Sequence, residues 1–249
     1  MYFSRAFETG FCGNMIGDAE VSSVGACFLE EPCSDDEVIM VVGAVEQMKA
    51  DEEALRSTAR DGKTRAALYI FRRPSVTAGR NASVNEEMLE RWRCAGHEFA
   101  RRPTGGGILR HDGDLCFGVA FPESTEAAIR GTGRHLERVS EAWRAALSKQ
   151  GIIVARAERP LVRAPRFCYT AGVGAELCLD GTKILGLAAR AIRGGVLVQG
   201  TLSTGRIDPE LDRTLVGAGP RISLRERCDC AELARNFREI LLKRNPLLV

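Results

Sequence analysis

Short apolar runs of the kind that form β-strands occupy much of this 249-residue chain, and only a few helical segments separate them. Glycines mark the turns between the last three runs, at Gly181 and at Gly194-Gly195. Strands and helices do not alternate strictly, as they do in a parallel α/β domain. The pattern therefore predicts the α+β class, with a mixed or antiparallel central sheet flanked by helices. We expect strands over 66–71, 75–78, 98–102, 108–110, 114–121, 152–157, 175–179, 183–192 and 196–203.

Four segments show the spacing of apolar residues that is typical of amphipathic helices. Ser34 and Glu37 have the spacing of a capping box, and Gly62 marks the end of the first helix. Asn85 begins a short second helix, and Ser124 can cap the longest one. We expect helices over 34–61, 85–95, 124–147 and 229–243.

The domain organisation follows from the same pattern. Residues 1–33 show no clear periodicity, and we interpret them as an irregular N-terminal extension. Residues 34–249 contain no linker, internal repeat or low-complexity tract, which predicts a single domain. Hydrophobic residues make up 45% of the chain, enough for this domain to bury a substantial core.

Charge and hydropathy argue against several functional classes. A formal net charge of +2 is too even for a general nucleic-acid-binding protein. No apolar run reaches the roughly 18 residues that span a bilayer, and the first residues lack the apolar region of a secretory signal. We therefore expect a cytoplasmic protein without a membrane partner. The nine cysteines form no CxxC pair, which predicts reduced thiols and no metal site.

The segment 101–107, with the sequence RRPTGGG, carries the clearest binding signal. Three consecutive glycines cost backbone entropy, but they let the main chain approach a ligand and direct N–H groups at negative charge. Arg101 and Arg102 can hold a carboxylate or phosphate through charge-assisted hydrogen bonds. A flexible turn explains the glycines equally well. His111, at the end of the next strand, is more typical of a structural histidine than of a general base.

A series of ordered motifs resembles the biotin and lipoate protein ligase family, which includes lipoate-protein ligases and cysteine-dependent octanoyltransferases. The segment 101–112 (RRPTGGGILRHD) resembles the RRxTGG...H signature of that family, and 48–52 (MKADE) resembles its early NxxxDE helix. Residues 68–80 resemble its YxWxPxxSxG strand pair. The segment 180–186 (DGTKILG) resembles the GKKIxG hairpin, and 198–202 (VQGTL) resembles the QHGSL strand.

This resemblance implies the family's catalytic fold and an enzyme that acylates a lysine on a lipoyl carrier domain. Cys168 precedes the hairpin lysine, Lys183, at the offset of the nucleophile in the octanoyltransferases. The resemblance thus implies an octanoyl- or lipoyltransferase with a Cys168 thioester, a catalytic Lys183 and no cofactor. The implied partners are an acyl carrier protein and a lipoyl-domain protein, either the glycine cleavage H protein or a 2-oxoacid dehydrogenase E2. The implied substrate-binding residues are Arg101, Arg102, Thr104, Gly105, Gly106, Gly107, His111, Gly186, Gln199 and Gly200.

Two alternatives remain open. An ATP-dependent lipoate-protein ligase would form lipoyl-AMP with ATP and Mg, and a third glycine at Gly107 is typical of that branch. A non-catalytic relative would only bind the carrier domain. Departures from the family pattern motivate this second alternative, because residues 186–191 lack the family's Ser and Gln and Gln199 replaces its His.

Overall fold

The computed structural model describes residues 38–124, 131–157, 174–217 and 221–243. Its centre is a mixed sheet of seven described strands, in which β1 runs parallel to β2 and all other neighbours are antiparallel. In order across the sheet, these strands are β1 Met40–Val42, β2 Arg65–Phe71, β6 Leu115–Pro122, β10 Gly195–Leu202, β9 Thr182–Ile192, β8 Leu177–Leu179 and β7 Ala155–Arg156. The predicted α+β class with a mixed central sheet is confirmed.

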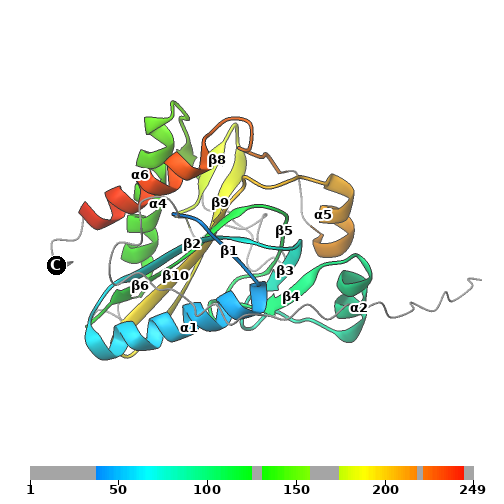
Figure 1. The fold of residues 1–249 in the computed structure, drawn as a ribbon, viewed down its shortest axis with the longest axis horizontal. Coiled ribbons are helices and arrows are strands. Elements are labelled where there is room, and N and C mark those ends of the chain that lie inside the picture. Colours follow the sequence, from blue (N-terminus) through cyan, green and yellow to red (C-terminus); the bar gives the residue numbers. More distant parts are fainter. Residues whose placement is uncertain (1–37, 125–130, 158–173, 218–220, 244–249) are drawn as a thin grey trace, which may run out of the picture.

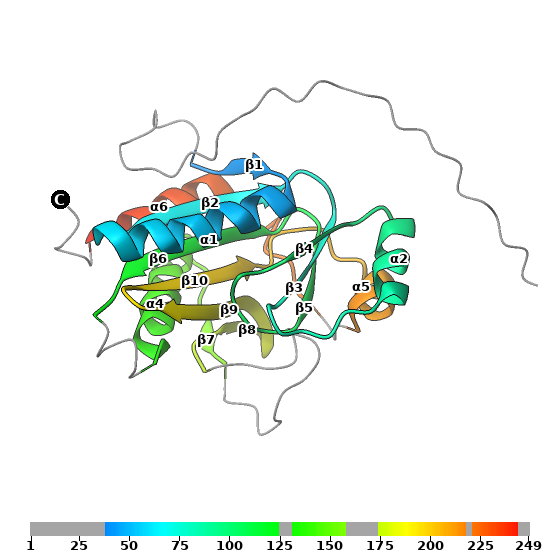
Figure 2. The ribbon, with the colours of Figure 1, turned by 90° about the horizontal axis from the view of Figure 1, so that it is seen from below.

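Helices cover both faces of this sheet. Helix α1 Ala44–Asp61 lies along one face, and α4 Gly133–Lys149 and α6 Cys230–Lys243 lie on the other (Figures 1 and 2). The apolar stripe of α4 is buried as its spacing predicts, and Trp143 stacks on Phe237 of α6 with ring centroids 3.9 Å apart. In the part of the chain that the structure describes, no helix is both long and apolar enough to cross a membrane.

A smaller sheet lies beside the first and carries the glycine-rich segment (Figure 2). Its three described strands, in spatial order, are β4 Glu98–Arg101, β3 Ser75–Ala78 and β5 Ile108–His111. Helices α2 Glu86–Cys94 and α5 Pro209–Val216 pack against this sheet. The buried ring of Trp92, from α2, is part of their shared apolar core. The indole N–H of Trp92 donates to the carbonyl of Leu215 at 2.8 Å, which joins the two helices.

The first helix begins later than the sequence predicts. Ser34 and Glu37 lie outside the described residues, and Met40–Val42 form β1, which pairs with the end of β2. Gly43 is the N-cap of α1 and has an extended backbone. The predicted helix is therefore wrong over residues 38–43, because Met40–Val42 pair with a strand, and this tertiary pairing outweighs their helical spacing.

Two other expected elements are shorter in the structure. Helix α4 begins at Gly133, with Thr132 at its N-cap, and not at Ser124. Residues 125–130 lie outside the described part of the chain, but 131 and 132 are not helical, so the helix does not run through from Ser124. The strand expected over 152–157 is reduced to Ala155–Arg156.

Helix α5 was missed, although local signals for it are present. The side chain of Asp208 accepts from the N–H groups of Glu210 and Leu211, Pro209 occupies the first helical position, and Gly217 ends the helix with φ of 60°. Each of these features is typical of a helix end. The apolar spacing does not predict this helix, because the segment is only about two turns long and its apolar stripe is short.

Buried ion pairs connect the smaller sheet to the segments that follow β10. Arg221 donates to both carboxylate oxygens of Asp114, at 3.0 and 3.1 Å, and these side chains are 1% and 0% exposed. Arg110 of β5 donates to Asp212 of α5 at 3.1 Å and to Asp112 at 3.0 Å. Because charges buried in this way require partners, the network fixes the β5–β6 turn relative to α5.

Removing one partner from this network should destabilise the fold strongly. We expect Arg221→Met to lower the free energy of unfolding by about 3–5 kcal/mol, because Asp114 would remain buried without its paired cation. The matched control is Arg56→Met, which removes an exposed pair with Glu52 and should cost less than about 1 kcal/mol. Denaturant unfolding of both variants measures the difference, and equal losses would contradict the assignment.

Candidate active site

Residues 104–107, which we call the glycine loop, connect β4 to β5 and lie against the end of β3. The N–H of Gly79 donates to the carbonyl of Gly107 at 3.0 Å, and the N–H of Arg80 donates to the carbonyl of Thr104 at 2.8 Å. A Cβ at Gly79 would lie 2.7 Å from the carbonyl carbon and oxygen of Gly105. Only glycine permits this approach of two backbones, so the loop is fixed against β3.

The two arginines before the loop hold its backbone. One nitrogen of Arg102, Nη1, donates to the hydroxyl of Thr77 at 2.7 Å, and Nη2 donates to the carbonyls of Gly105 at 3.2 Å and Gly107 at 2.8 Å. Arg101 donates to three backbone carbonyls in the turn after β3. The sequence predicted that these guanidinium groups bind a carboxylate or phosphate. In the structure both groups bond to the loop and the adjacent turn, and their binding of an anion stays a prediction.

His111 at the end of β5 connects this region to the main sheet. Its Nε2 lies 2.7 Å from the hydroxyl of Thr77, and its Nδ1 lies 3.6 Å from the sulfur of Cys116 on β6. The same sulfur lies 3.5 Å from the hydroxyl of Thr201 on β10. Since Arg102 already donates to the Thr77 oxygen, the hydroxyl proton of Thr77 is available for Nε2. This favours the tautomer of His111 with a proton on Nδ1.

The Cys116–His111 pair has the residue types of a nucleophile and its base but not their charge states. Burial lowers the pKa of His111 to about 3, so the imidazole is neutral at physiological pH. Burial also raises the pKa of the Cys116 thiol far above its usual range. A neutral thiol is a weak nucleophile. Cys116 is therefore a structural residue, and His111 has the structural role that its position at a strand end indicates.

Lys183 lies on the same face of the main sheet as this chain of contacts. Its Nζ is 3.1 Å from Oε1 of Glu176, and the two side chains are 11% and 2% exposed. A Cβ on Gly186 would be 3.7 Å from Cε of Lys183 and 3.8 Å from the methyl group of Thr201. The position of Gly186 thus lies between the lysine stem and Thr201, on the face that both share. From Thr201 the contacts continue through Cys116 to His111 and the smaller sheet.

A second polar path reaches the glycine loop from α1. The amide oxygen of Gln199 accepts from the hydroxyl of Thr104 at 2.7 Å, and its amide nitrogen donates to Asp51 at 2.6 Å. Asp51 also accepts from Gln47 at 2.8 Å and from Tyr69 at 3.0 Å. Burial raises the pKa of this carboxyl to about 6, an effect that the hydrogen bonds partly offset. The sequence predicted Thr104 and Gln199 but assigned no role to Asp51.

Two predicted site residues differ from the rest. Gly200 faces the core under α4 and α6, because a Cβ there would collide with Phe117 and would lie 2.6 Å from the Gly186 carbonyl. Any contact of Gly200 with substrate would have to come from its backbone. Cys168 lies outside the described residues. Among the described residues, no cluster of three metal-ligating side chains occurs.

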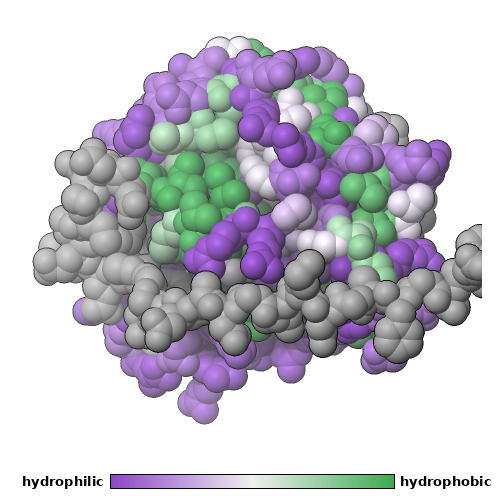
Figure 3. All heavy atoms as spheres, turned by 45° about the vertical axis from the view of Figure 1, so that its right-hand side comes forward, coloured by the Kyte–Doolittle hydropathy of each residue, from purple (hydrophilic) through white to green (hydrophobic). Residues whose placement is uncertain are grey.

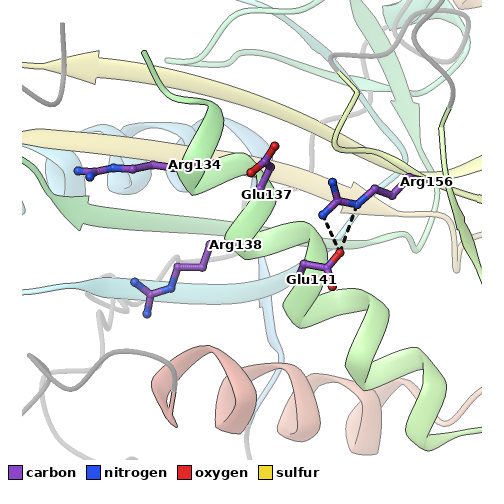
Figure 4. A pocket seen from close by; sticks show the side chains of 5 residues that line it. All are labelled: Arg134, Glu137, Arg138, Glu141 and Arg156. Atoms are coloured by element: carbon purple, nitrogen blue, oxygen red, sulfur yellow. Dashed lines mark hydrogen bonds and ion pairs between the residues drawn. The ribbon is translucent and has the colours of Figure 1, made fainter. Parts of the chain in front are cut away.

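A pocket on the outer side of α4 is separate from these residues (Figure 4). Charged side chains line it, and Arg156 donates to the carboxylate of Glu141 across it at 2.8 Å. The lining residues are Arg134, Glu137, Arg138, Glu141 and Arg156. Helix α4 covers the face of the sheet opposite to α1, whereas Gln199 faces α1. The charged pocket is therefore not continuous with the predicted site.

Apolar surface is also present, as Figure 3 shows in a hydrophobic patch bordered by hydrophilic side chains. Among the described residues, Val41 of β1 is 60% exposed and Ile153, before β7, is 75% exposed. Strands β1 and β7 form the opposite edges of the main sheet. Single exposed apolar side chains are normal on a protein surface, so neither residue by itself defines a binding site.

The chain matches the lipoyl protein ligase A/B catalytic domain over residues 44–226 and belongs to that family. This match spans both sheets, the glycine loop and the Lys183 hairpin. The family resemblance expected from the ordered motifs is thus confirmed, including its extent through the middle of the chain.

Curated relatives lie in the octanoyltransferase branch. The chain is 29% identical over 171 residues to octanoyltransferase LipM of Geobacillus kaustophilus, covering 61% of this chain and 58% of that protein. It is 28% identical over 157 residues to octanoyltransferase LipM of Moorella thermoacetica, covering 60% and 57%. The chain thus spans less than two thirds of the length of these relatives.

Solved structures with the same fold are lipoate-protein ligases. Lipoate-protein ligase A bound with ATP has a TM-score of 0.66 at 20% identity, over 82% of this chain and 83% of that one. A putative lipoate protein ligase from T. acidophilum with bound lipoic acid has a TM-score of 0.64 at 18% identity, over 82% and 84%. At these identities the likeness confirms the ligase-type catalytic fold and carries no conclusion about the reaction.

The contact between β3 and the glycine loop predicts different effects on stability for two similar substitutions. Gly79→Ala should lower the free energy of unfolding by about 1–3 kcal/mol, because the new methyl group overlaps the loop backbone. Gly105→Ala should have little effect on stability, because a Cβ there meets nothing within 4 Å. Denaturant unfolding compares the two variants, and a stable Gly79→Ala protein would refute the close approach.

The buried neutral state of His111 predicts a specific pH dependence. The pKa of His111 is about 3 in the folded protein and near 6.5 in the unfolded chain. Below pH 6.5 only the unfolded chain takes up this proton, so stability is lost as the pH falls. Between pH 6.5 and 5 the loss should be about 1.6 kcal/mol. We expect His111→Gln to lack this component, which comparison of its unfolding free energy with that of wild type at both pH values isolates.

Proposed function

We propose that this chain transfers an octanoyl or lipoyl group to the lysine of a lipoyl carrier domain through a thioester on Cys168. Family membership and the octanoyltransferases among its relatives support this proposal. The observation that carries it is the shared face of Lys183, Thr201 and the contacts that lead to the glycine loop. This face combines a cation with a backbone loop fixed in place, which are the two elements that acyl transfer needs.

The proposed reaction has two balanced steps. In the first, the Cys168 thiolate attacks the thioester carbonyl of the acyl donor, a new C–S bond forms, and the donor's sulfur leaves and takes up a proton. In the second, the amine of the target lysine attacks the enzyme thioester, an amide forms, and the Cys168 thiolate is released while the amine loses a proton. Exchange of one thioester for another is nearly neutral in free energy. The transferase therefore requires neither ATP nor another cofactor.

Lys183 is suited to assist both steps. A nearby ammonium lowers the pKa of a thiol and so increases the thiolate fraction at neutral pH. Glu176 holds the ammonium, and its other carboxylate oxygen accepts from the N–H of Gly174 at 3.0 Å. Lys183 would also polarise the thioester carbonyl. This assignment predicts that Lys183 acts on the segment that contains Cys168.

The glycine loop is suited to stabilise the oxyanion of the tetrahedral intermediate. The carbonyls of Thr104, Gly105 and Gly107 accept hydrogen bonds from Arg80, Arg102 and Gly79. With its carbonyls directed at these protein donors, the loop can present amide N–H groups to negative charge on its other side. Because Arg102 and Gly79 fix the loop before substrate binds, little reorganisation is needed during the reaction.

The proposed partners are an acyl carrier protein as donor and a lipoyl-domain protein as acceptor, either the glycine cleavage H protein or a 2-oxoacid dehydrogenase E2. One structural neighbour, at 20% identity, is a bipartite lipoate protein ligase from Thermoplasma acidophilum studied with its E2 lipoyl domain. We further propose that residues 34–249 form one catalytic domain, that residues 1–33 are an extension, and that the protein acts in the cytoplasm.

Replacing the proposed nucleophile tests the mechanism directly. Incubation of the wild-type protein with octanoyl-acyl carrier protein, without ATP, should add one octanoyl group to its intact mass. Cys168→Ser should abolish this adduct and the transfer of octanoate to a lipoyl domain. The matched control is Cys178→Ser, because Cys178 pairs with Lys183 across β8 and β9 and burial raises the pKa of its thiol. This control should keep the adduct. Full transfer by Cys168→Ser would overturn the proposal.

Two assays separate the alternatives. A lipoate-protein ligase would catalyse exchange of pyrophosphate into ATP that depends on lipoate and Mg, and we expect none. A non-catalytic relative would bind the lipoyl domain without an acyl adduct on any cysteine. The octanoyltransferase relatives disfavour the ligase.

A further inference from the structure

The carboxylate of Asp51 lies against the strands that carry the proposed acyl-transfer face. It lies on α1 and is completely buried, and three donors converge on it from Gln47, Tyr69 and Gln199. The strand below makes room for it, because a Cβ at Gly118 would lie 2.6 Å from its Oδ1. A buried carboxylate costs free energy, as the raised pKa of Asp51 reflects. Packing alone does not account for its presence.

The hydrogen bonds around Asp51 have a fixed direction. A carboxylate only accepts hydrogen bonds, so Gln199 must turn its amide nitrogen toward Asp51. Its amide oxygen then faces Thr104 and accepts from the hydroxyl at 2.7 Å. In this way the carboxylate selects one of the two amide orientations of Gln199, and this orientation selects the position of the Thr104 side chain.

Thr104 is the first residue of the glycine loop and is completely buried. Its carbonyl accepts from the N–H of Arg80, and Gly107 at the other end of the loop accepts from Gly79. The backbone bonds attach the loop to β3 of the smaller sheet, whereas the Thr104 hydroxyl attaches it to β10 of the main sheet. This hydroxyl therefore determines how the loop is placed relative to the face that holds Lys183.

We propose that Asp51 is a positioning residue that acts through Gln199 and the Thr104 hydroxyl to set the glycine loop over the acyl-transfer face. Asp51 itself touches neither substrate nor reacting atoms. Its part in catalysis rests on the function proposed above, but its effect on the loop does not. The amide of Gln199 accepts from Thr104 on one side and donates to Asp51 on the other. A glutamine can therefore connect the two side chains at a position where the family pattern has histidine.

Hydrogen exchange measures the loop independently of activity. The amides of Gly79 and Arg80 donate to the loop, so their exchange reports its opening. Thr104→Val removes the hydroxyl at nearly constant volume, and exchange of these two amides should become roughly tenfold faster, as expected for loss of one buried hydrogen bond. Thr104→Ser retains the hydroxyl and should exchange like wild type.

A second pair of variants changes Asp51, at the other end of the hydrogen-bond path from Thr104. Asp51→Ala removes the acceptor and should accelerate exchange at Gly79 and Arg80, which it does not touch. Asp51→Asn keeps an oxygen for Gln199 and Tyr69, while Gln47 can turn its own amide to match, so protection should be largely restored. A double variant of Asp51→Ala and Thr104→Val should be no more affected than Thr104→Val alone, because both act on one path.

The outcomes separate this inference from the proposed function. In the octanoyl-transfer assay, Thr104→Val should lower kcat for adduct formation several-fold, and Thr104→Ser should restore it. Unchanged exchange at Gly79 and Arg80 in both Thr104→Val and Asp51→Ala would overturn the inference, whatever the activity. If wild type forms no acyl adduct but the exchange pattern is as described, the positioning role stands and the proposed function fails.

Discussion

The close approach of two backbones at Gly79 is the constraint on which the rest of the site depends. A side chain there would overlap the glycine loop, and its absence lets the N–H groups of Gly79 and Arg80 hold the loop by its carbonyls. Arg102 satisfies further carbonyls from within the sheet. The carbonyls of Thr104, Gly105 and Gly107 therefore all have protein partners. These hydrogen bonds thus keep the loop ordered, although three consecutive glycines cost backbone entropy on folding.

Burial keeps two polar groups between the sheets uncharged. Cys116 and His111 are in contact, yet burial keeps both uncharged, so they cannot form a thiolate–imidazolium pair. Lys183, in contrast, has a carboxylate partner in Glu176 at 3.1 Å and is 11% exposed. A reactive thiol would therefore gain stabilisation beside Lys183 and none beside His111. This contrast argues against a nucleophile on β6.

Much of the fold could be predicted because its signals are local. Asn85 caps α2, Gly62 ends α1, and glycines mark the turns around β9 and β10. The failures came where tertiary contacts decide. Residues 40–42 have helical spacing but pair with β2, and no local signal specifies that partner. The division of the strands into two sheets was also missed, because strand order depends on pairings between segments distant in sequence.

The sequence by itself determined the family and the α+β class, because turn glycines, capping residues and ordered motifs are written in neighbouring positions. Only the tertiary structure decided what these residues do. It bonded Arg101 and Arg102 to backbone carbonyls, turned Gly200 toward the helical core, and brought Asp51 to Gln199 across 148 positions of the chain. The physical reason is that hydrogen-bond partners and pKa values depend on burial and on distances in space, which separation along the chain does not specify.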